Sequence, residues 1–334
     1  MRTQVIAEIA QAHDGSLGLL YSLIDAAAEA KVDVVKFQMH IAEAESSVHE
    51  QFRVNFSQQD ATRYDYWQRM EFTFEQWQDI KSYVESLGLE FMCSPFSCRA
   101  VDALERLGVK RYKIGSGEVN DPLILHKVIS TKKPIILSSG MSNYEQLDIA
   151  VNLCKSNNID VSLLQCTTEY PTLPENVGLH VINEMKERYN IPVGLSDHSS
   201  ERVTSLAAVA IGAELIEVHL TFDKTMFGPD SSSSLTVSEL TQLVQEIRYL
   251  ERVLASSETK SADSRSEKYA SMFGKSLAVN RDLKAGYKLT VDDLESKKPS
   301  GHGIPSTHFQ HVVGKSLIRD IQKYDFIQEE DLND

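Results

Sequence analysis

The chain has 334 residues, of which 42% are hydrophobic and 25% charged, as in ordinary soluble globular proteins. Its net charge of −14 argues against a nucleic-acid partner, because a phosphate-binding surface needs a basic field, although a few local cations would still hold a small anion. The N-terminal residues lack a signal-peptide pattern, and no apolar stretch approaches the roughly 20 residues of a membrane span. The four cysteines have no CxxC spacing. We therefore expect a cytoplasmic protein with reduced thiols and no membrane partner.

Short apolar runs recur along the chain, and each breaks off into charged, hydroxyl or histidine side chains. They are VIAEIA (5–10), VDVVKFQ (32–38), LEFMCSP (89–95), RYKIGSGE (111–118), PIILSSG (134–140), VSLLQCTT (161–168), PVGLSD (192–197) and ELIEVHLT (214–221). Amphipathic segments separate them. This repetition predicts an α/β fold, a (β/α)8 TIM barrel, whose active site is built at the carboxyl ends of its strands.

Apolar residues at a helical period of three to four predict helices between these strands. The segments are 19–31, 74–88 and 240–257, and a further set of apolar residues at this spacing precedes Gly108. Gly88 and Gly108 stand where C-cap glycines belong.

The stretch from about Ile41 to Phe72 lengthens one strand-to-strand connection and carries Arg53, Arg63 and Trp67. Long loops on the carboxyl face of a barrel commonly form lids or substrate walls. A helical insertion packed on the outside of the barrel is an equally weighted alternative.

A domain boundary follows the last long helix. Residues 1–257 are expected to form the barrel, the polar, serine-rich residues 258–272 a linker, and residues 273–334 a small, mostly β domain. LKAGYKLT (283–290) and IQKYDFIQ (321–328) both read as a turn followed by a strand, which indicates an internal duplication.

Two histidines, His198 and His219, end successive runs. Neighbouring barrel strands are about 5 Å apart, so both imidazoles could bind one divalent ion. Glu217 lies on the same strand face as His219, and Asp197 and Asp230 offer further carboxylates. Such ligands suit Mn²⁺, Fe²⁺ or Zn²⁺ better than Ca²⁺, although a histidine can also serve only to hydrogen-bond a loop.

Lysines and hydroxyls form a second group at the strand ends. Lysine ammonium groups, hydroxyls and backbone N–H groups together make a cradle for phosphate or carboxylate. The residues are Lys36, Lys113, Ser94, Ser116, Ser138 and Ser196. Glu8 and Glu118 would lie at the same carboxyl end of the barrel, where a carboxylate could hold a sugar hydroxyl or move protons.

Eight segments in this order resemble the sialic acid synthase family, which includes legionaminate, pseudaminate and spore-coat polysaccharide synthases. They are IAEIAQAHDG, AAAEAKVDVVKFQ, YKIGSGE, PIILSSGM, QCTTEYP, GLSDH, EVHLTFD and GPD. The tail with DLKAGYKLTVDDLESKKPSGHGI is similar to the antifreeze-like (SAF) domain that ends those enzymes.

The resemblance implies a condensation of phosphoenolpyruvate with an N-acylmannosamine-type aldose, giving a 2-keto-3-deoxy acid and phosphate. By this resemblance His198 and His219 would bind Mn²⁺, with Mg²⁺ or Co²⁺ as alternatives. Lys113 and the serines Ser94, Ser116, Ser138 and Ser196 would bind phosphoenolpyruvate. The residues that would contact the sugar and the reacting centre are Glu8, Lys36, Gln38, Glu118, Thr168, Tyr170 and Asp230. Glu118 is the first choice for proton transfer.

The chain departs from the family pattern on the sugar side. Ala12-His13-Asp14-Gly15 replaces an Asn-His-Asn-Gly-like motif, and Lys298 stands where the family places an arginine that reaches the partner subunit's barrel in a domain-swapped homodimer. Lysine keeps the charge but loses the planar fork. The acceptor is therefore expected to differ from plain N-acetylmannosamine.

Two other functions stay open at this point. One is a barrel aldolase that forms a Schiff base between pyruvate and Lys36 or Lys113. The other is a non-catalytic sugar-binding or scaffold protein.

Overall fold

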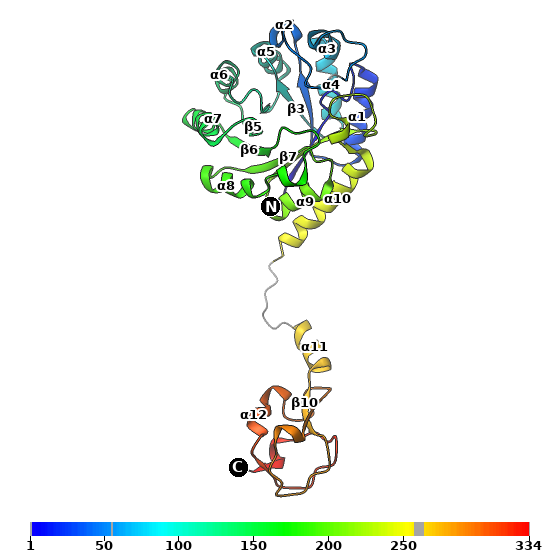
Figure 1. The fold of residues 1–334 in the computed structure, drawn as a ribbon, viewed down its shortest axis with the longest axis vertical. Helices are drawn as coiled ribbons and strands as arrows, with labels where there is room; N and C mark the ends of the chain where they lie inside the picture. Colours follow the sequence, from blue (N-terminus) through cyan, green and yellow to red (C-terminus); the bar gives the residue numbers. More distant parts are fainter. Residues whose placement is uncertain (1, 55, 257–263, 334) are drawn as a thin grey trace. The chain divides into compact units, whose positions relative to one another are not determined.

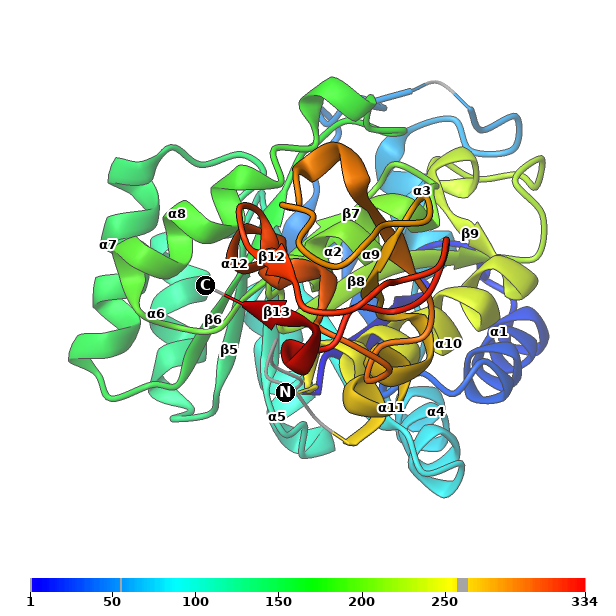
Figure 2. The ribbon, with the colours of Figure 1, turned by 90° about the horizontal axis from the view of Figure 1, so that it is seen from below.

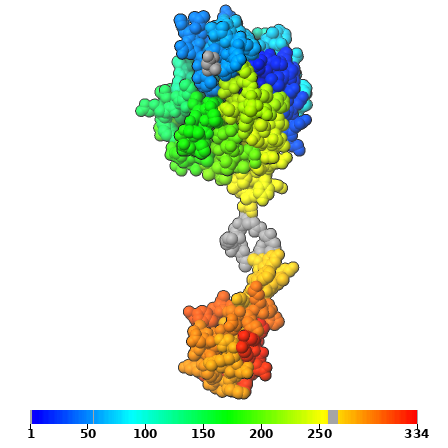
Figure 3. All heavy atoms as spheres, turned by 45° about the vertical axis from the view of Figure 1, so that its right-hand side comes forward, coloured from blue at the N-terminus to red at the C-terminus, as the bar shows by residue number. Residues whose placement is uncertain are grey.

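The computed structural model describes residues 2–54, 56–256 and 264–333, and the chain divides into two compact units, residues 1–256 and 257–334 (Figures 1 and 3). Each unit has its own apolar core. Among the described residues, no helix has the length and apolar character needed to cross a membrane.

The first unit is the predicted parallel barrel. Its strands are β1 (Gln4–Glu8), β2 (Val34–Met39), β3 (Glu90–Pro95), β4 (Tyr112–Ile114), β5 (Ile135–Ser138), β6 (Val161–Cys166), β7 (Val193–Asp197) and β8 (Leu215–Thr221). The parallel ladder runs in the order β3-β2-β1-β8-β7-β6-β5-β4, and β3 and β4 contact one another across the remaining seam. All eight predicted runs are thus confirmed as strands.

Helices follow each strand and surround the barrel (Figures 1 and 2). They are α1 (Leu17–Glu29), α4 (Phe74–Ser86), α5 (Cys98–Leu107), α6 (Pro122–Ser130), α7 (Tyr144–Ser156), α8 (His180–Tyr189), α9 (Arg202–Ala210) and α10 (Val237–Leu254). Local sequence sets their ends: Thr73 and Thr236 form capping boxes at the starts of α4 and α10. Gly88 and Gly108 adopt the left-handed conformation just past α4 and α5, as predicted.

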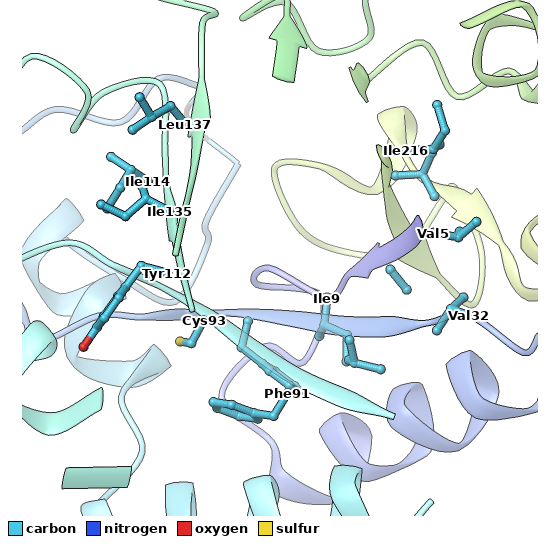
Figure 4. Packing of buried hydrophobic residues seen from close by; sticks show 14 of the residues in the cluster. Val5, Ile9, Val32, Phe91, Cys93, Tyr112, Ile114, Ile135, Leu137 and Ile216 are labelled. Carbon is cyan, nitrogen blue, oxygen red and sulfur yellow. The ribbon is translucent and has the colours of Figure 1, made fainter. Parts of the chain in front are cut away.

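Alternation along each strand sorts the side chains into two sets. One set faces the helices and forms the main core, in which Phe91, Tyr112 and Leu137 pack with their neighbours (Figure 4). The other set faces the barrel axis and begins with an apolar layer. This layer consists of Ile6, Val34, Met92, Ile136, Leu164 and Leu215, all buried. We call it the apolar floor.

The insertion between β2 and β3 contains α2 (Ala42–Glu45) and α3 (Arg63–Met70). Ala42, Tyr66, Trp67 and Met70 form a small buried cluster of their own. The guanidinium of Arg69 joins α3 to the loop after β1 through an ion pair with Asp14 at 2.6 Å, and it pairs with Asp60 of the insertion itself at 2.7 Å. Asp14, which departs from the family motif, therefore has a structural partner in the insertion.

The second unit contains α11 (Ser264–Phe273), β10 (Ser276–Val279), β11 (Leu294–Lys297), α12 (Phe309–Val312), β12 (Ser316–Leu317) and β13 (Leu332–Asn333). Helix α11 occupies part of the segment expected to be a linker. Its Tyr269, Met272 and Phe273 lie at helical spacing but remain exposed, which is why the sequence shows no buried apolar face there.

The second unit is internally duplicated. Strand β10 pairs with β11, and β12 pairs with β13. In each half an arginine bonds the buried aspartate twelve positions further on: Arg281 bonds Asp293, and Arg319 bonds Asp331. The segments 283–290 and 321–328 form isolated bridges around a turn, rather than the strands expected from the sequence.

Candidate active site

A cavity of about 300 Å³ opens at the carboxyl ends of the barrel strands. The barrel residues predicted to bind the substrates or the metal, with the exception of Asp197, line it. These residues are Glu8, Lys36, Gln38, Ser94, Lys113, Ser116, Glu118, Ser138, Thr168, Tyr170, Ser196, His198, His219 and Asp230. The structure thus brings the predicted set together, while their individual roles remain predictions.

Strand geometry explains why these side chains converge. Glu8 lies two residues beyond Ile6 of the apolar floor, Ser94 two beyond Met92, and Ser138 two beyond Ile136. Residues separated by two positions point to the same face of a strand. A polar layer therefore lies directly above the apolar floor.

The base of the cavity holds a compact network of buried charges. Lys36 Nζ lies 3.1 Å from both Glu8 Oε2 and Glu217 Oε1, and Lys113 Nζ lies 3.3 Å from the same Glu217 oxygen. Ser196 Oγ also donates to Glu217 Oε1, at 3.0 Å, whereas the buried Glu217 Oε2 has no hydrogen-bond partner among the described residues. One carboxylate oxygen thus joins both lysines, and the other is left available.

Opposing effects set the pKa values of this network. Burial opposes the charged form of Lys36, but Glu217 and Glu8 raise its pKa above the ordinary value. Burial likewise favours a neutral Glu217, but Lys113 and Lys36 together lower its pKa. For Lys113, burial is the larger effect and lowers the pKa. Lys36 and Glu217 are therefore a charged pair, and Lys113 is the more easily deprotonated lysine.

The predicted serines surround this base. Ser138 Oγ accepts a hydrogen bond from Lys113 Nζ at 2.7 Å, and Ser116 Oγ accepts one from the Gly140 backbone N–H at 3.1 Å. Ser94 Oγ is buried and has no partner among the described residues. Hydroxyls of this kind can donate to an anionic ligand once it enters.

Glu118 lies in the turn after β4, and its carboxylate packs over Gly115. Burial, with a smaller contribution from Glu45, raises its pKa from 4.5 to about 7. A carboxyl group that titrates near neutral pH is suited to both giving and accepting a proton.

His198 and His219 lie together at the ends of β7 and β8, with ring centroids 5.2 Å apart. His198 Nδ1 lies 3.0 Å from the Thr167 carbonyl oxygen, which can only accept, so the neutral ring carries its proton there and leaves Nε2 unprotonated. Burial lowers the pKa of both histidines, which favours the neutral form that binds metals. This donor set fits a divalent ion.

The metal site would be an open one. Within the described ranges, no three His, Cys, Asp or Glu side chains converge as a metal cage. The two histidines would therefore supply only part of the coordination sphere, and the remaining positions would be left to water or substrate.

The insertion forms one wall of the cavity, so the substrate-wall interpretation is the one that the structure supports. Arg53, Arg63 and Trp67 all line the cavity. His40 stacks between Trp67, at a centroid distance of 3.8 Å, and Phe96, at 4.4 Å.

Sequence reasoning missed some of the lining residues, among them Gln11, His40, Phe96 and Met141. Gln11 Nε2 donates to Gln38 Oε1, and Gln38 Nε2 in turn donates to Glu8 Oε1 at 2.7 Å. His40 follows β2 directly and ends an apolar run, a signal that could have identified it.

Two predicted site residues are not among those that line this cavity. The buried carboxylate of Asp197 instead accepts hydrogen bonds from the Ser199 backbone N–H and from the Ser205 hydroxyl, both at 2.9 Å. Lys298 is the other. It lies in the second unit, exposed, with its ammonium 5.0 Å from the centre of the Phe273 ring. Its predicted contact with a sugar stays a prediction.

Comparison with known proteins places the chain in a family. Residues 23–259 match the NeuB family, and residues 274–333 match the SAF domain. The chain is 33% identical to the N,N'-diacetyllegionaminic acid synthase of Campylobacter jejuni, over 98% of this chain and 99% of that one. It is 34% identical to the human N-acetylneuraminate-9-phosphate synthase, over 98% of this chain and 91% of that one.

A solved structure is similar as well: the N-acetylneuraminic acid synthetase of Leptospira borgpetersenii, in complex with citrate, has a TM-score of 0.71 at 29% identity, covering 80% of this chain and 90% of that one. The family match covers most of the barrel, and the relatives exceed 30% identity over nearly the whole chain. The chain belongs to the NeuB family and carries a carboxy-terminal SAF domain.

Proposed function

We propose that this protein is a synthase that condenses phosphoenolpyruvate with an N-acylmannosamine-type or related aldose, and with water, to give a 2-keto-3-deoxy nonulosonic acid and phosphate. Its named relatives are synthases of sialic and legionaminic acids. The observation that carries the proposal is the gathering of two lysines, four serines, a histidine pair and Glu118 in one cavity.

The base of the cavity would hold phosphoenolpyruvate. Lys113 and Ser138 already share a hydrogen bond. The Ser94 hydroxyl, which has no partner in the described part of the chain, adds a donor. Ammonium and hydroxyl donors in a buried site favour a phosphate or carboxylate group strongly. The charge of Lys36 would complement the same anion.

Carboxylates would assist the reacting centre. Carbon 3 of phosphoenolpyruvate bonds to the aldehyde carbon of the sugar, which leaves positive charge at carbon 2. Glu8 and Glu217 face the cavity beside Lys36 and would stabilise this charge. Water then adds at carbon 2, and Glu118 would carry the proton that the water releases to the oxygen of the former aldehyde, which becomes a hydroxyl group. Cleavage of the C–O bond at carbon 2 releases phosphate, which takes the proton of the new hydroxyl as the keto group forms.

His198 and His219 would bind Mn²⁺, with Mg²⁺ or Co²⁺ as alternatives. A bound divalent ion would act as a Lewis acid that polarises and orients the sugar aldehyde. Both rings are held in place by aromatic packing, since Tyr170 stacks on His198 at 4.1 Å and meets His219 edge-on at 6.0 Å.

The proposal also covers the oligomeric state of the protein and its cellular compartment. We infer a homodimer in which Lys298 of one chain serves the barrel of its partner, a closed twofold arrangement. The four cysteines are free, in keeping with a reducing cytoplasm.

The test offers phosphoenolpyruvate and Mn²⁺ with a panel of N-acetyl, diacetamido and unsubstituted hexoses. Phosphate release, matched by a product of the condensed mass and abolished by chelation, is the expected result. Substitution of either metal-site histidine (H198A or H219A) should lower the bound Mn²⁺ measured by metal analysis.

A Schiff-base aldolase is the competing function, since burial lowers the pKa of Lys113 and so favours its nucleophilic neutral form. Borohydride trapping of a pyruvate adduct on Lys113, together with condensation activity that survives metal chelation, would contradict the proposed synthase function.

A further inference from the structure

Arg53 lies on the insertion wall, at the outer part of the cavity. Its Nη2 donates to Asp230 Oδ1 at 2.8 Å and to the Pro229 carbonyl oxygen at 3.2 Å. The guanidinium also lies over the Tyr170 ring, with Cζ 4.2 Å from the ring centroid. One side chain of the insertion therefore contacts two residues predicted to meet the sugar.

Tyr170 contacts both Arg53 and His198. The His198 ring stacks on Tyr170 at a centroid distance of 4.1 Å and an interplanar angle of 25°. Tyr170 therefore links the arginine of the wall to the histidine pair through direct contacts.

Arg53 retains unused donors. A guanidinium has five N–H groups in a planar fork, and only Nη2 of Arg53 has hydrogen-bond partners among the described residues. Its side chain is 41% exposed. The Nε and Nη1 groups are therefore available to an oxygen atom of a bound sugar.

The positive charges of the two arginines on the wall are balanced by carboxylates. Arg53 pairs with Asp230, and Arg63, the other arginine of the wall, lies 3.4 Å from Glu50. A divalent ion on the histidines would, by contrast, add positive charge to the cavity. A phosphorylated sugar would need unpaired cations at the wall, whereas an uncharged hydroxyl or acetamido oxygen needs only donors.

From these contacts we propose that Arg53 is an acceptor-binding residue, which holds Tyr170 and Asp230 in place and donates to an uncharged, oxygen-bearing substituent of the sugar. The inference rests on the proposed function and narrows its acceptor to uncharged aldoses.

The experiment compares the wild type with R53A and R53K in the full chain. A matched control is R99A, since Arg99 is exposed, pairs with Glu43 and does not line the cavity. Phosphate release gives separate KM values for phosphoenolpyruvate and for an N-acetyl or diacetamido hexose, and the 6-phosphate of the same sugar is offered in parallel. Circular dichroism and thermal melting establish that each variant is folded.

R53A should raise the acceptor KM about 10- to 100-fold, the range expected for hydrogen bonds from a charged group, and change the KM for phosphoenolpyruvate less than about twofold. R53K should fall between R53A and the wild type because it keeps the charge without the fork. R99A should resemble the wild type.

Equal changes in both KM values, or none, in folded variants would overturn the role of Arg53. A wild type that prefers the 6-phosphate would overturn the uncharged acceptor. Absence of phosphate release by the wild type with every sugar would instead overturn the proposed function, and the inference with it.

Discussion

The carboxylate of Glu118 lies so close over Gly115 that a Cβ added to this glycine would be 2.5 Å from Glu118 Oε2. A real Cβ does not tolerate this separation, so the position of the Glu118 carboxylate requires a glycine at position 115. The conformation of the proposed proton-transfer group is thus set by the absence of a side chain three positions earlier.

G115A should therefore displace the Glu118 carboxylate and lower kcat by about 10²-fold, near the lower end of what general acid–base groups contribute. G18A is the matched control, because Gly18 is exposed, does not line the cavity, and an added Cβ would meet only Ser16 Oγ at 3.9 Å. Steady-state phosphate release measures both. Equal activity of the two variants would contradict the proton-transfer role of this geometry.

The raised pKa of Glu118 predicts a pH-dependent cost in stability. Between pH 4.5 and about 7 the folded protein keeps a proton that the unfolded chain has released. Stability therefore decreases as pH rises through this window, since the unfolded state binds fewer protons. E118Q removes the titration, so its melting temperature should rise relative to the wild type from pH 4.5 to 7. A constant difference across that range would disprove the pKa shift.

Glu217 forms ion pairs with two buried lysines, Lys36 and Lys113, through one oxygen. E217Q should destabilise the barrel by about 3 kcal/mol, because removing one partner leaves buried charge uncompensated. Both tryptophans of the chain, Trp67 and Trp77, belong to the barrel, so tryptophan fluorescence during urea unfolding reports this unit alone. E214Q is a suitable control, since Glu214 is a partly exposed partner of Lys186. Similar unfolding midpoints for the two variants would argue against a compensating role.

Lys298 provides a test of the predicted assembly. K298M should raise the KM for the sugar about tenfold, the effect of losing roughly 1.4 kcal/mol of binding, and leave bound Mn²⁺ unchanged. K323M is a control in the same unit, since Lys323 also lies beside an aromatic ring, 4.8 Å from the centre of Tyr324. Kinetics with each substrate and metal analysis distinguish the two. An unchanged sugar KM in K298M would remove the reason to place this loop at a barrel.

Much of the fold and the site could be predicted from the sequence because both depend on local pattern. Each barrel strand combines an apolar run with a polar end, and the period of two places Ile6 below Glu8 and Ile136 below Ser138. Helix ends were readable where a glycine such as Gly108 adopts the left-handed conformation.

The rest depends on contacts between distant segments. Nothing local indicates that Arg53 bonds Asp230, 177 positions away, or that His40 stacks between Trp67 and Phe96. Helix α11 was missed for a different reason: its apolar residues are exposed, so the segment reads as polar.

The apolar floor closes the barrel beneath Glu8, Lys36 and Ser138. On the proposed assignment, phosphoenolpyruvate would lie at the base of the cavity, next to this floor, and the sugar would lie near the partly exposed Arg53, closer to solvent. The sugar would then block the way to the bottom once it is bound. Turnover should therefore be ordered, with phosphoenolpyruvate entering first, and an excess of the sugar should slow the reaction by occupying the mouth too early.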